Sequence, residues 1–276
     1  MSPAETLLIP RRPVRSRLPE PELDTTPENF ACEPWGGMVA AETATALVAA
    51  SHGTASPAGQ AAIRGLVEAV ARHRPDLAVR EAFVDVQKPD VPTVLAGLRE
   101  ETRVVPLLLS AGYHVHVDLA EAAASSDQVS VTRALGPDQR LVKVLAKRLQ
   151  QAGLRRGDRV VLACAGSTDA RAVSDCETTA RLLSAFLGMD VAAGYISAAE
   201  PELKAAVAAE QARIARRRLA GRHARVVVAS YLLAPGYFAS LAAGCGADLV
   251  SLPLLVPNEE PPKDLVDLML DRFARG

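Results

Sequence analysis

Two histidines stand where their side chains could do chemistry. His52 directly follows one apolar run and His114 comes soon after another, so both are expected near the ends of buried strands. Imidazole titrates near neutral pH and binds transition metals, so the pair could hold a metal ion and accept a proton. Asp118 lies four residues after His114, on the same face of a predicted helix. Its carboxylate could orient the imidazole, attract a cation, or serve only as a first-turn acid that favours the helix dipole.

The other residue patterns do not indicate a different kind of catalytic or metal site. The four cysteines, Cys32, Cys164, Cys176 and Cys245, lack the close pairs of a zinc or iron–sulfur site. The sequence has no nucleophile elbow, phosphate-binding loop or dinucleotide-binding fingerprint. Two histidines fit an open site, in which a metal is handled transiently, better than a closed structural one.

The chain repeats the segments that carry the histidines, but without the histidines. Leu47-Val-Ala-Ala-Ser-His52-Gly53-Thr54 reappears as Val160-Val-Leu-Ala-Cys-Ala165-Gly166-Ser167, and Ala111-Gly112-Tyr113-His114 reappears as Pro235-Gly236-Tyr237-Phe238. Ala165 thus replaces His52, and Phe238 replaces His114. We therefore expect one active site, built by the first copy and walled by the second.

Each copy has the pattern of alternating strands and helices. In the first, strands are expected at 46–51, 78–85, 104–110 and 129–132, and helices at 59–72, 92–99, 115–124 and 140–151. In the second, strands are expected at 159–164, 190–197, 224–230 and 247–252, and helices at 170–187, 201–219, 237–243 and 263–274. This alternation predicts an α/β fold of two tandem, similar, doubly wound parallel sheets.

The predicted sheet order explains how the two histidines could meet. In a flavodoxin-like order the first and third strands are neighbours, and ligands bind at the carboxyl ends of the strands. His52 and His114 would then converge in a cleft between the two domains. Residues 1–44 are proline-rich and are expected to form a partly disordered leader. Residues 45–153 form the predicted half with the histidines, and residues 158–276 the half without them.

Composition excludes several classes of partner. The net charge is −1 and the aromatic content is 4%, which argues against nucleic acid or an anionic membrane surface. No segment approaches the ~20 apolar residues that cross a bilayer. The scattered cysteines are expected as buried free thiols, as in a protein of the reducing cytoplasm.

The sequence resembles the class II metal chelatases, in particular the long, duplicated sirohydrochlorin chelatases of sirohaem and cobalamin synthesis. Members of that family carry H-G-[ST] after the first strand, here His52-Gly53-Thr54, and G-x-H-V-x-x-D after the third, here 112–118. They also carry an aromatic-x5-Pro element and a Leu-Gly-Pro, here at 83–89 and 135–137. The resemblance covers about residues 45–276, and the usual proline that follows the second motif is absent here.

The resemblance implies a chelatase-like fold and the insertion of Fe²⁺ or Co²⁺ into sirohydrochlorin, with no ATP and no organic cofactor. By carry-over, His52 and His114 would be the catalytic, metal-binding and proton-accepting pair. Asp118 would support them or deliver the metal. A non-catalytic protein that binds or delivers the metal or the tetrapyrrole is the alternative.

The resemblance also implies where the tetrapyrrole would bind. Its contacts would come from Gly53, Thr54, Tyr113 and Phe238, with Ala165 and Phe238 forming an apolar wall opposite the histidines. Lys88 and Arg133 are candidates for its carboxylates. Because the duplicated chain supplies both walls, we expect a monomer.

Overall fold

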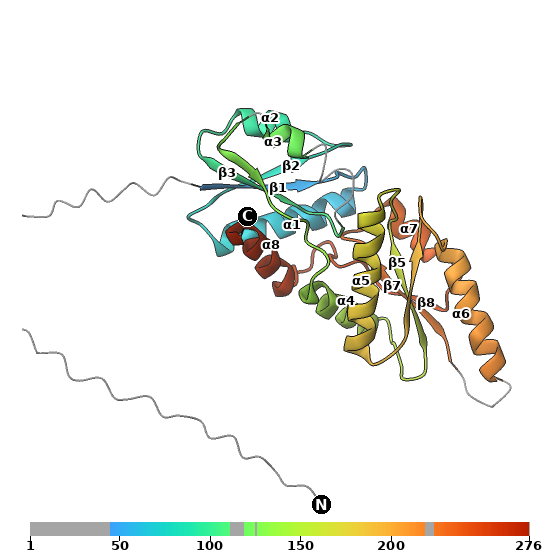
Figure 1. Ribbon diagram of the computed structural model, residues 1–276. Coiled ribbons are helices and arrows are strands. Elements are labelled where there is room, and N and C mark those ends of the chain that lie inside the picture. Colours follow the sequence, from blue (N-terminus) through green and yellow to red (C-terminus); the bar gives the residue numbers. More distant parts are fainter. Residues whose placement is uncertain (1–44, 111–118, 125, 219–223, 276) are drawn as a thin grey trace, which may run out of the picture. The chain divides into compact units, whose positions relative to one another are not determined.

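The computed structural model describes residues 45–110, 119–124, 126–218 and 224–275 (Figure 1). The chain divides into Met1–Ala41 and a compact unit, Glu42–Gly276, which holds all the described residues. The predicted leader, residues 1–44, lies outside the described part of the chain. Within that part, no helix is long and apolar enough to cross a membrane.

The first half of the compact unit is built on a four-stranded parallel sheet in the order β2-β1-β3-β4. Its β1 and β3 are neighbours, as the flavodoxin-like order predicts. The strands and helices of this half are β1 (Thr45–Ser51), α1 (Pro57–His73), β2 (Ala78–Phe83), α2 (Val91–Ala96), β3 (Glu101–Pro106), α3 (Ala120–Ala123), β4 (Val129–Val131) and α4 (Gln139–Gln151).

The second half repeats this order in a second parallel sheet, β6-β5-β7-β8. Its elements are β5 (Arg159–Cys164), α5 (Ala170–Leu187), β6 (Val191–Tyr195), α6 (Leu203–Arg218), β7 (Val226–Tyr231), α7 (Tyr237–Ala243), β8 (Leu249–Val250) and α8 (Lys263–Arg275). The predicted α/β architecture of two tandem parallel-sheet domains is confirmed.

The duplication extends to single backbone hydrogen bonds. Val84 N–H donates to Ser51 O in the first half, and Ile196 N–H donates to Cys164 O in the second, each over 2.9 Å. The glycines that follow β1 and β5, Gly53 and Gly166, have φ values of 91° and 93°. The two copies therefore present the same turn at the carboxyl end of the first strand of each sheet.

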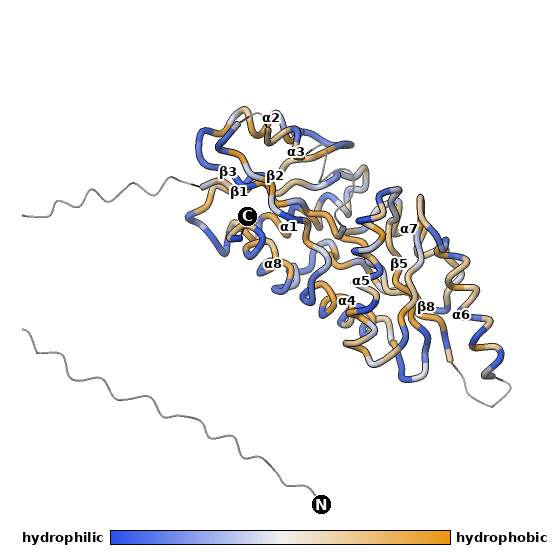
Figure 2. The backbone as a smooth tube through the Cα atoms, viewed as in Figure 1, coloured by the Kyte–Doolittle hydropathy of each residue, from blue (hydrophilic) through white to orange (hydrophobic). Residues whose placement is uncertain are grey.

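Alternate residues of each first strand face different hydrophobic clusters. In β1, Leu47 and Ala49 pack with α1, while Val48 and Ala50 pack with α2. The same alternation in β5 assigns Val161 and Ala163 to the cluster that contains α6. Figure 2 shows the strands as largely hydrophobic, as expected for parallel sheets with both faces covered.

The last helix of each half packs on the sheet of the other half. Helix α4 contacts β7 and α5, and helix α8 contacts β3 and α1. Figure 1 shows α8, in dark red, beside the first sheet, and α4 beside α5. A single hydrophobic core therefore runs through both halves, with α1, α8, α4 and α5 as its central layer.

Two equivalent arginines hold these exchanged helices. Arg148 of α4 is 4% exposed and donates to the carbonyl oxygen of Leu254 over 3.1 and 3.3 Å. Arg272 of α8 is 2% exposed and donates to the carbonyl oxygens of Ala134 and Leu135 over 2.9 and 2.8 Å. Each buried guanidinium thus satisfies backbone acceptors of the opposite half, which a lysine could do less completely.

The bounds of most predicted elements match the observed ones to within three residues, and two elements differ more. The strand predicted at 104–110 is β3, which begins at Glu101 and ends at Pro106. Beyond Pro106 the backbone leaves the sheet, and Leu108 O accepts from Leu135 N–H over 2.9 Å. The apolar run continues because the next residues line a pocket and not a strand. Of the helix predicted at 115–124, the structure shows α3 at Ala120–Ala123, and residues 115–118 lie outside the described part.

Candidate active site

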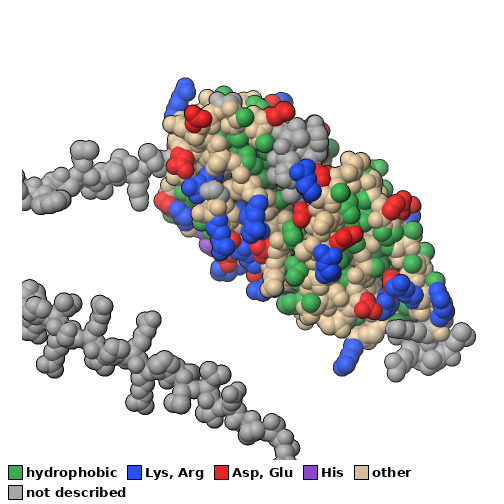
Figure 3. Space-filling view, in the orientation of Figure 1, with side chains coloured by type: hydrophobic (Ala, Val, Ile, Leu, Met, Phe, Trp, Pro, Cys, Tyr) green, Lys and Arg blue, Asp and Glu red, His purple; other side chains and the backbone are tan. Residues whose placement is uncertain are grey.

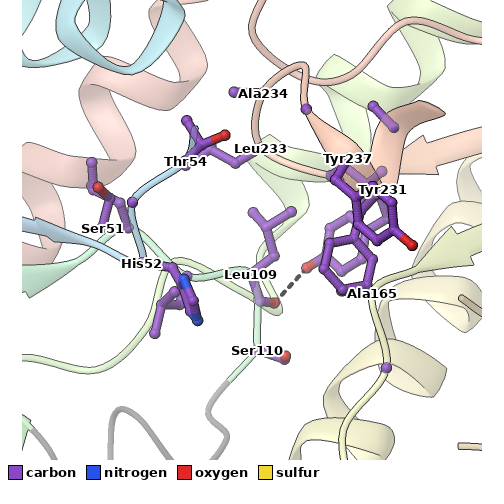
Figure 4. A pocket seen from close by; sticks show the side chains of 18 of the residues that line it. Ser51, His52, Thr54, Leu109, Ser110, Ala165, Tyr231, Leu233, Ala234 and Tyr237 are labelled. Carbon is purple, nitrogen blue, oxygen red and sulfur yellow. Dashed lines mark hydrogen bonds between the residues drawn. The ribbon is translucent and has the colours of Figure 1, made fainter. Parts of the chain in front are cut away.

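A pocket of about 740 Å³ lies where the carboxyl ends of β1, β3, β5 and β7 face one another (Figure 4). The first half contributes residues 51–55 and 107–110, and the second contributes residues 165–168 and 231–239. Parallel α/β sheets place ligands at this end of their strands, and the volume is typical of small-molecule sites. The pocket is thus the predicted cleft between the two halves.

His52 enters this pocket from the tip of β1. Ser51, the last strand residue, is 1% exposed, whereas His52 is exposed. The His52 carbonyl oxygen accepts from Asp85 N–H over 3.1 Å, which ties the turn to the loop after β2. A Cβ added at Gly53 would overlap the Asp85 carbonyl oxygen, so only glycine permits this tight turn. Figure 4 shows the imidazole facing the space beside Leu109 and Ser110.

Thr54 links the turn after β1 to its surroundings. Its N–H donates to Gln87 Oε1 over 2.8 Å, and its Oγ1 accepts from Ser56 N–H over 3.1 Å. The side chain also lies next to Gly236 of the second half, where an added Cβ would stand 3.3 Å from Thr54 Oγ1. The hydroxyl is therefore engaged in shaping the turn on which His52 sits.

The two halves touch again at the start of α1. Ser56 caps the helix by accepting from Gly59 N–H over 3.3 Å. A Cβ added at Gly59 would overlap the carbonyl oxygen of Pro235 in the second half. Gly59 therefore lets the loop before α7 approach the helix, a role that its sequence context does not reveal.

The second half presents an uncharged wall to the pocket. Ala165 occupies the position equivalent to His52, and Tyr237 and Phe238 stand at the start of α7. The rings of Tyr237 and Phe238 meet edge to face, with centroids 5.9 Å apart. Their exposures, 74% and 39%, are high for aromatic side chains and leave apolar area available for a ligand.

The described lining of the pocket contains no lysine, arginine, aspartate or glutamate. The two basic candidates for binding substrate carboxylates, Lys88 and Arg133, are not among the lining residues. Lys88 instead pairs with Asp90, whose pKa that hydrogen bond lowers. On the face shown in Figure 3, basic and acidic side chains are interspersed.

Two further polar groups lie at the floor of the pocket. Tyr231 donates from its hydroxyl to the carbonyl oxygen of Leu109 over 2.8 Å, and burial raises the pKa of this phenol, which keeps it protonated. Cys176 lines the pocket next to buried Cys164, whose pKa is raised by the contact with Cys176 and by burial. Cys164, Cys176 and Cys245 are all buried free thiols, as expected.

The structure brings four of the seven predicted site residues to this pocket. His52, Gly53, Thr54 and Phe238 line it. The other three, Tyr113, His114 and Asp118, lie outside the described residues. Within the described part of the chain, no three His, Cys, Asp or Glu side chains are grouped to hold a metal ion.

The first half of this pocket matches a known family. The CbiX family model matches residues 46–152, which include β1, β3 and the turn with His52. The sequence resemblance to class II chelatases is thereby confirmed for this part of the chain.

Solved structures extend the likeness to both halves of the chain. SirB from Bacillus subtilis with Fe³⁺ is 22% identical, with a TM-score of 0.63, over 84% of this chain and 94% of that one. The sirohydrochlorin chelatase SirB from Bacillus subtilis subspecies spizizenii, in complex with cobalt, is 21% identical, with a TM-score of 0.61, over 83% of this chain and 93% of that one.

A third neighbour is DR2241 from Deinococcus radiodurans, a multi-domain protein with structural similarity to chelatases. It is 20% identical, with a TM-score of 0.59, over 85% of this chain and 55% of that one. No curated protein matches the sequence. At these identities the likeness establishes the two-sheet fold.

Proposed function

We propose that the protein inserts a divalent metal, Fe²⁺ or Co²⁺, into sirohydrochlorin. The observation that carries this proposal is an interdomain pocket with His52 on one wall and uncharged, partly aromatic residues on the other. The CbiX match over the histidine-bearing half supports it. So do two neighbours of the same fold, SirB with Fe³⁺ and the sirohydrochlorin chelatase SirB in complex with cobalt.

The proposed chemistry uses the two properties of imidazole. A metal ion must lose water ligands before it enters the macrocycle, and two pyrrole N–H protons must leave. A neutral imidazole can use its free lone pair to replace a water on the metal, and once it has released the metal the same lone pair can accept a proton. We assign these roles to His52 together with His114, with Asp118 as the carboxylate that supports His114 or attracts the cation.

The proposed binding mode places the flat macrocycle between the two walls. Tyr237 and Phe238 supply exposed aromatic area for its apolar face. Gly53 has no side chain, so the macrocycle can approach the backbone at that residue. Because the described lining has no basic side chain, the carboxylates of the substrate are directed toward the open side of the pocket. Tyr113 is proposed as a further contact from the first half.

The proposed organisation is one catalytic unit per chain. Residues 45–153 carry the catalytic half and residues 158–276 the opposing half, preceded by the leader of residues 1–44. Since the lining of the pocket comes from both halves of a single chain, a monomer is sufficient. We propose a cytoplasmic enzyme.

The proposal is tested by following the visible spectrum of sirohydrochlorin during incubation with Fe²⁺, Co²⁺ or Ni²⁺. Wild type should accelerate insertion, and His52→Ala should lose roughly 100-fold or more in rate, because it removes a ligand and a proton acceptor. His73→Ala is the matched control, since its Nδ1 lies 2.9 Å from Ala69 O at the end of α1, outside the pocket.

The outcome separates the enzyme from its alternative. If wild type binds metal and tetrapyrrole without accelerating insertion, the protein is a carrier and the proposal is wrong. If His52→Ala inserts metal as fast as wild type, the assignment of His52 is wrong.

A further inference from the structure

Tyr231 of the second half forms a hydrogen bond to the part of the pocket wall that the first half provides. It ends β7, and its side chain is 2% exposed. Its hydroxyl donates to Leu109 O over 2.8 Å, shown as the dashed line in Figure 4. A carbonyl oxygen only accepts, so the direction of this bond is fixed. The bond joins residues 122 positions apart in the sequence.

The surroundings of this hydrogen bond are closely packed. Thr179 Oγ1 lies 3.2 Å from the Tyr231 hydroxyl oxygen and 3.0 Å from Asp175 O, so its single proton is shared between two acceptors. Gly136 lies against the other side, where an added Cβ would overlap both Leu109 O and the Tyr231 hydroxyl. The position of the tyrosine oxygen is therefore set by contacts from both halves.

The backbone that Tyr231 holds is the part of the pocket wall that has left the sheet. After Pro106, Leu107 N–H still donates to Ala50 O over 2.8 Å, and Leu108 O accepts from Leu135 N–H over 2.9 Å. Both partners belong to the first half. The next carbonyl, that of Leu109, is held from the second half.

Among the described residues, the repeat has no equivalent of this hydrogen bond in the opposite direction, from the first half to the second. Cys164 pairs with Tyr231 across β5 and β7, and Ala50 pairs with Pro106 across β1 and β3. Counting one residue further along β1 and β3 makes Leu107 the equivalent of Tyr231. The first half thus has no hydroxyl to offer at that position, while the half without histidines has one.

We propose that Tyr231 is a positioning residue for metal insertion. It fixes the Leu109 carbonyl and thereby the part of the pocket wall, Leu109 and Ser110, beside which the His52 imidazole lies. The inference rests on the proposed function. It gives the second half a task beyond forming an apolar wall, namely to hold the wall of the first half next to His52.

The test compares the two tyrosines that end β6 and β7, the strands on either side of β5. Tyr231→Phe removes the bonded hydroxyl and keeps the ring. Tyr195→Phe is the matched control, because Tyr195 is 1% exposed and its hydroxyl has no hydrogen-bond partner in the described structure. Thr179→Val removes only the neighbour of the Tyr231 hydroxyl.

Two readouts are combined on the full chain. The first is amide hydrogen exchange of residues 107–110, which should become about tenfold faster in Tyr231→Phe and stay unchanged in Tyr195→Phe. The second is metal insertion, for which kcat should fall about tenfold while KM for the tetrapyrrole stays within about twofold. Thr179→Val should change both in the same direction by less.

Each outcome decides the proposal. Unchanged exchange in Tyr231→Phe overturns it, as does faster exchange with an unchanged kcat. Equal losses in Tyr231→Phe and Tyr195→Phe overturn it too, because they indicate a general loss of stability. If wild type itself inserts no metal, the proposed function fails. The exchange data then still decide whether Tyr231 fixes the segment.

Discussion

Gly59 and Gly65 lie on the same helix, and alanine should have opposite effects at the two positions. At Gly65 of α1 the nearest neighbour of an added Cβ is Pro261 Cγ, 4.0 Å away. Alanine there gains helix propensity, so Gly65→Ala should raise the free energy of unfolding by up to about 1 kcal/mol. At Gly59, in the first turn, an added Cβ overlaps the Pro235 carbonyl oxygen and approaches Thr54 Cγ2 to 2.9 Å.

The clash at Gly59 outweighs the propensity gain. The main obstacle is backbone, which cannot rotate away as a flexible side chain can, and overpacking of this kind costs roughly 1–3 kcal/mol. The propensity gain in a first turn is small, so Gly59→Ala should lose about 1–2 kcal/mol. Because Pro235 leads into the turn that carries Tyr237, the same change should raise KM for the tetrapyrrole, whereas Gly65→Ala should leave KM unchanged.

Urea unfolding followed by circular dichroism measures both free energies, with the m-value as a check that the unfolded state is unchanged. Two results would refute the reasoning. One is a Gly59→Ala protein as stable as wild type. The other is a pair of variants that shift stability in the same direction by the same amount, which would mean that propensity alone governs both sites.

Three further predictions follow from buried charges and from the pocket. Arg272→Met should lower the free energy of unfolding by about 3–5 kcal/mol, because the carbonyl oxygens of Ala134 and Leu135 lose their hydrogen-bond donor. As a control, Lys263→Met on the exposed face of α8 should lower it by less than about 1 kcal/mol. Burial opposes ionisation of Asp138, but hydrogen bonds from Arg140 and the charge of Arg272 prevail and lower its pKa to about 2. The stability that this carboxylate contributes, about 2 kcal/mol, is present above pH 4 and is lost as pH falls toward 2, so the unfolding free energies of wild type and Asp138→Asn should converge over that range. Finally, KM for sirohydrochlorin should change less than about twofold between about 50 and 500 mM NaCl, because the described pocket has no basic side chain, and a steep rise with salt would contradict this binding mode.

The order of the elements and the position of His52 could be predicted from the sequence because both depend on local signals. An apolar run that ends at His52-Gly53 predicts a strand tip, and the tip lies at the pocket as expected. The repeat then places Ala165 on the opposing half. These inferences need only hydrophobic pattern and turn chemistry.

What the sequence could not predict depends on contacts between distant residues. The amphipathic pattern of α8 predicts one buried face, but it does not say which sheet that face covers. Arg148 and Arg272 resemble surface arginines until the carbonyls they bind are known. Tyr231 sits in an apolar strand, and its partner is 122 residues away. The basic groups Lys88 and Arg133 were candidates by charge alone, and neither lines the pocket.

The exchanged helices make the two halves inseparable. A chain cut between Gln151 and Arg159 would leave each fragment without one of the helices that cover its sheet, because that helix belongs to the other fragment. Each fragment would then expose part of the shared core, so mixing the two should restore structure that neither regains alone. The same arrangement is what a domain-swapped homodimer becomes when its two copies are fused end to end. After fusion each copy can change independently, and a histidine can be lost from one without being lost from the other.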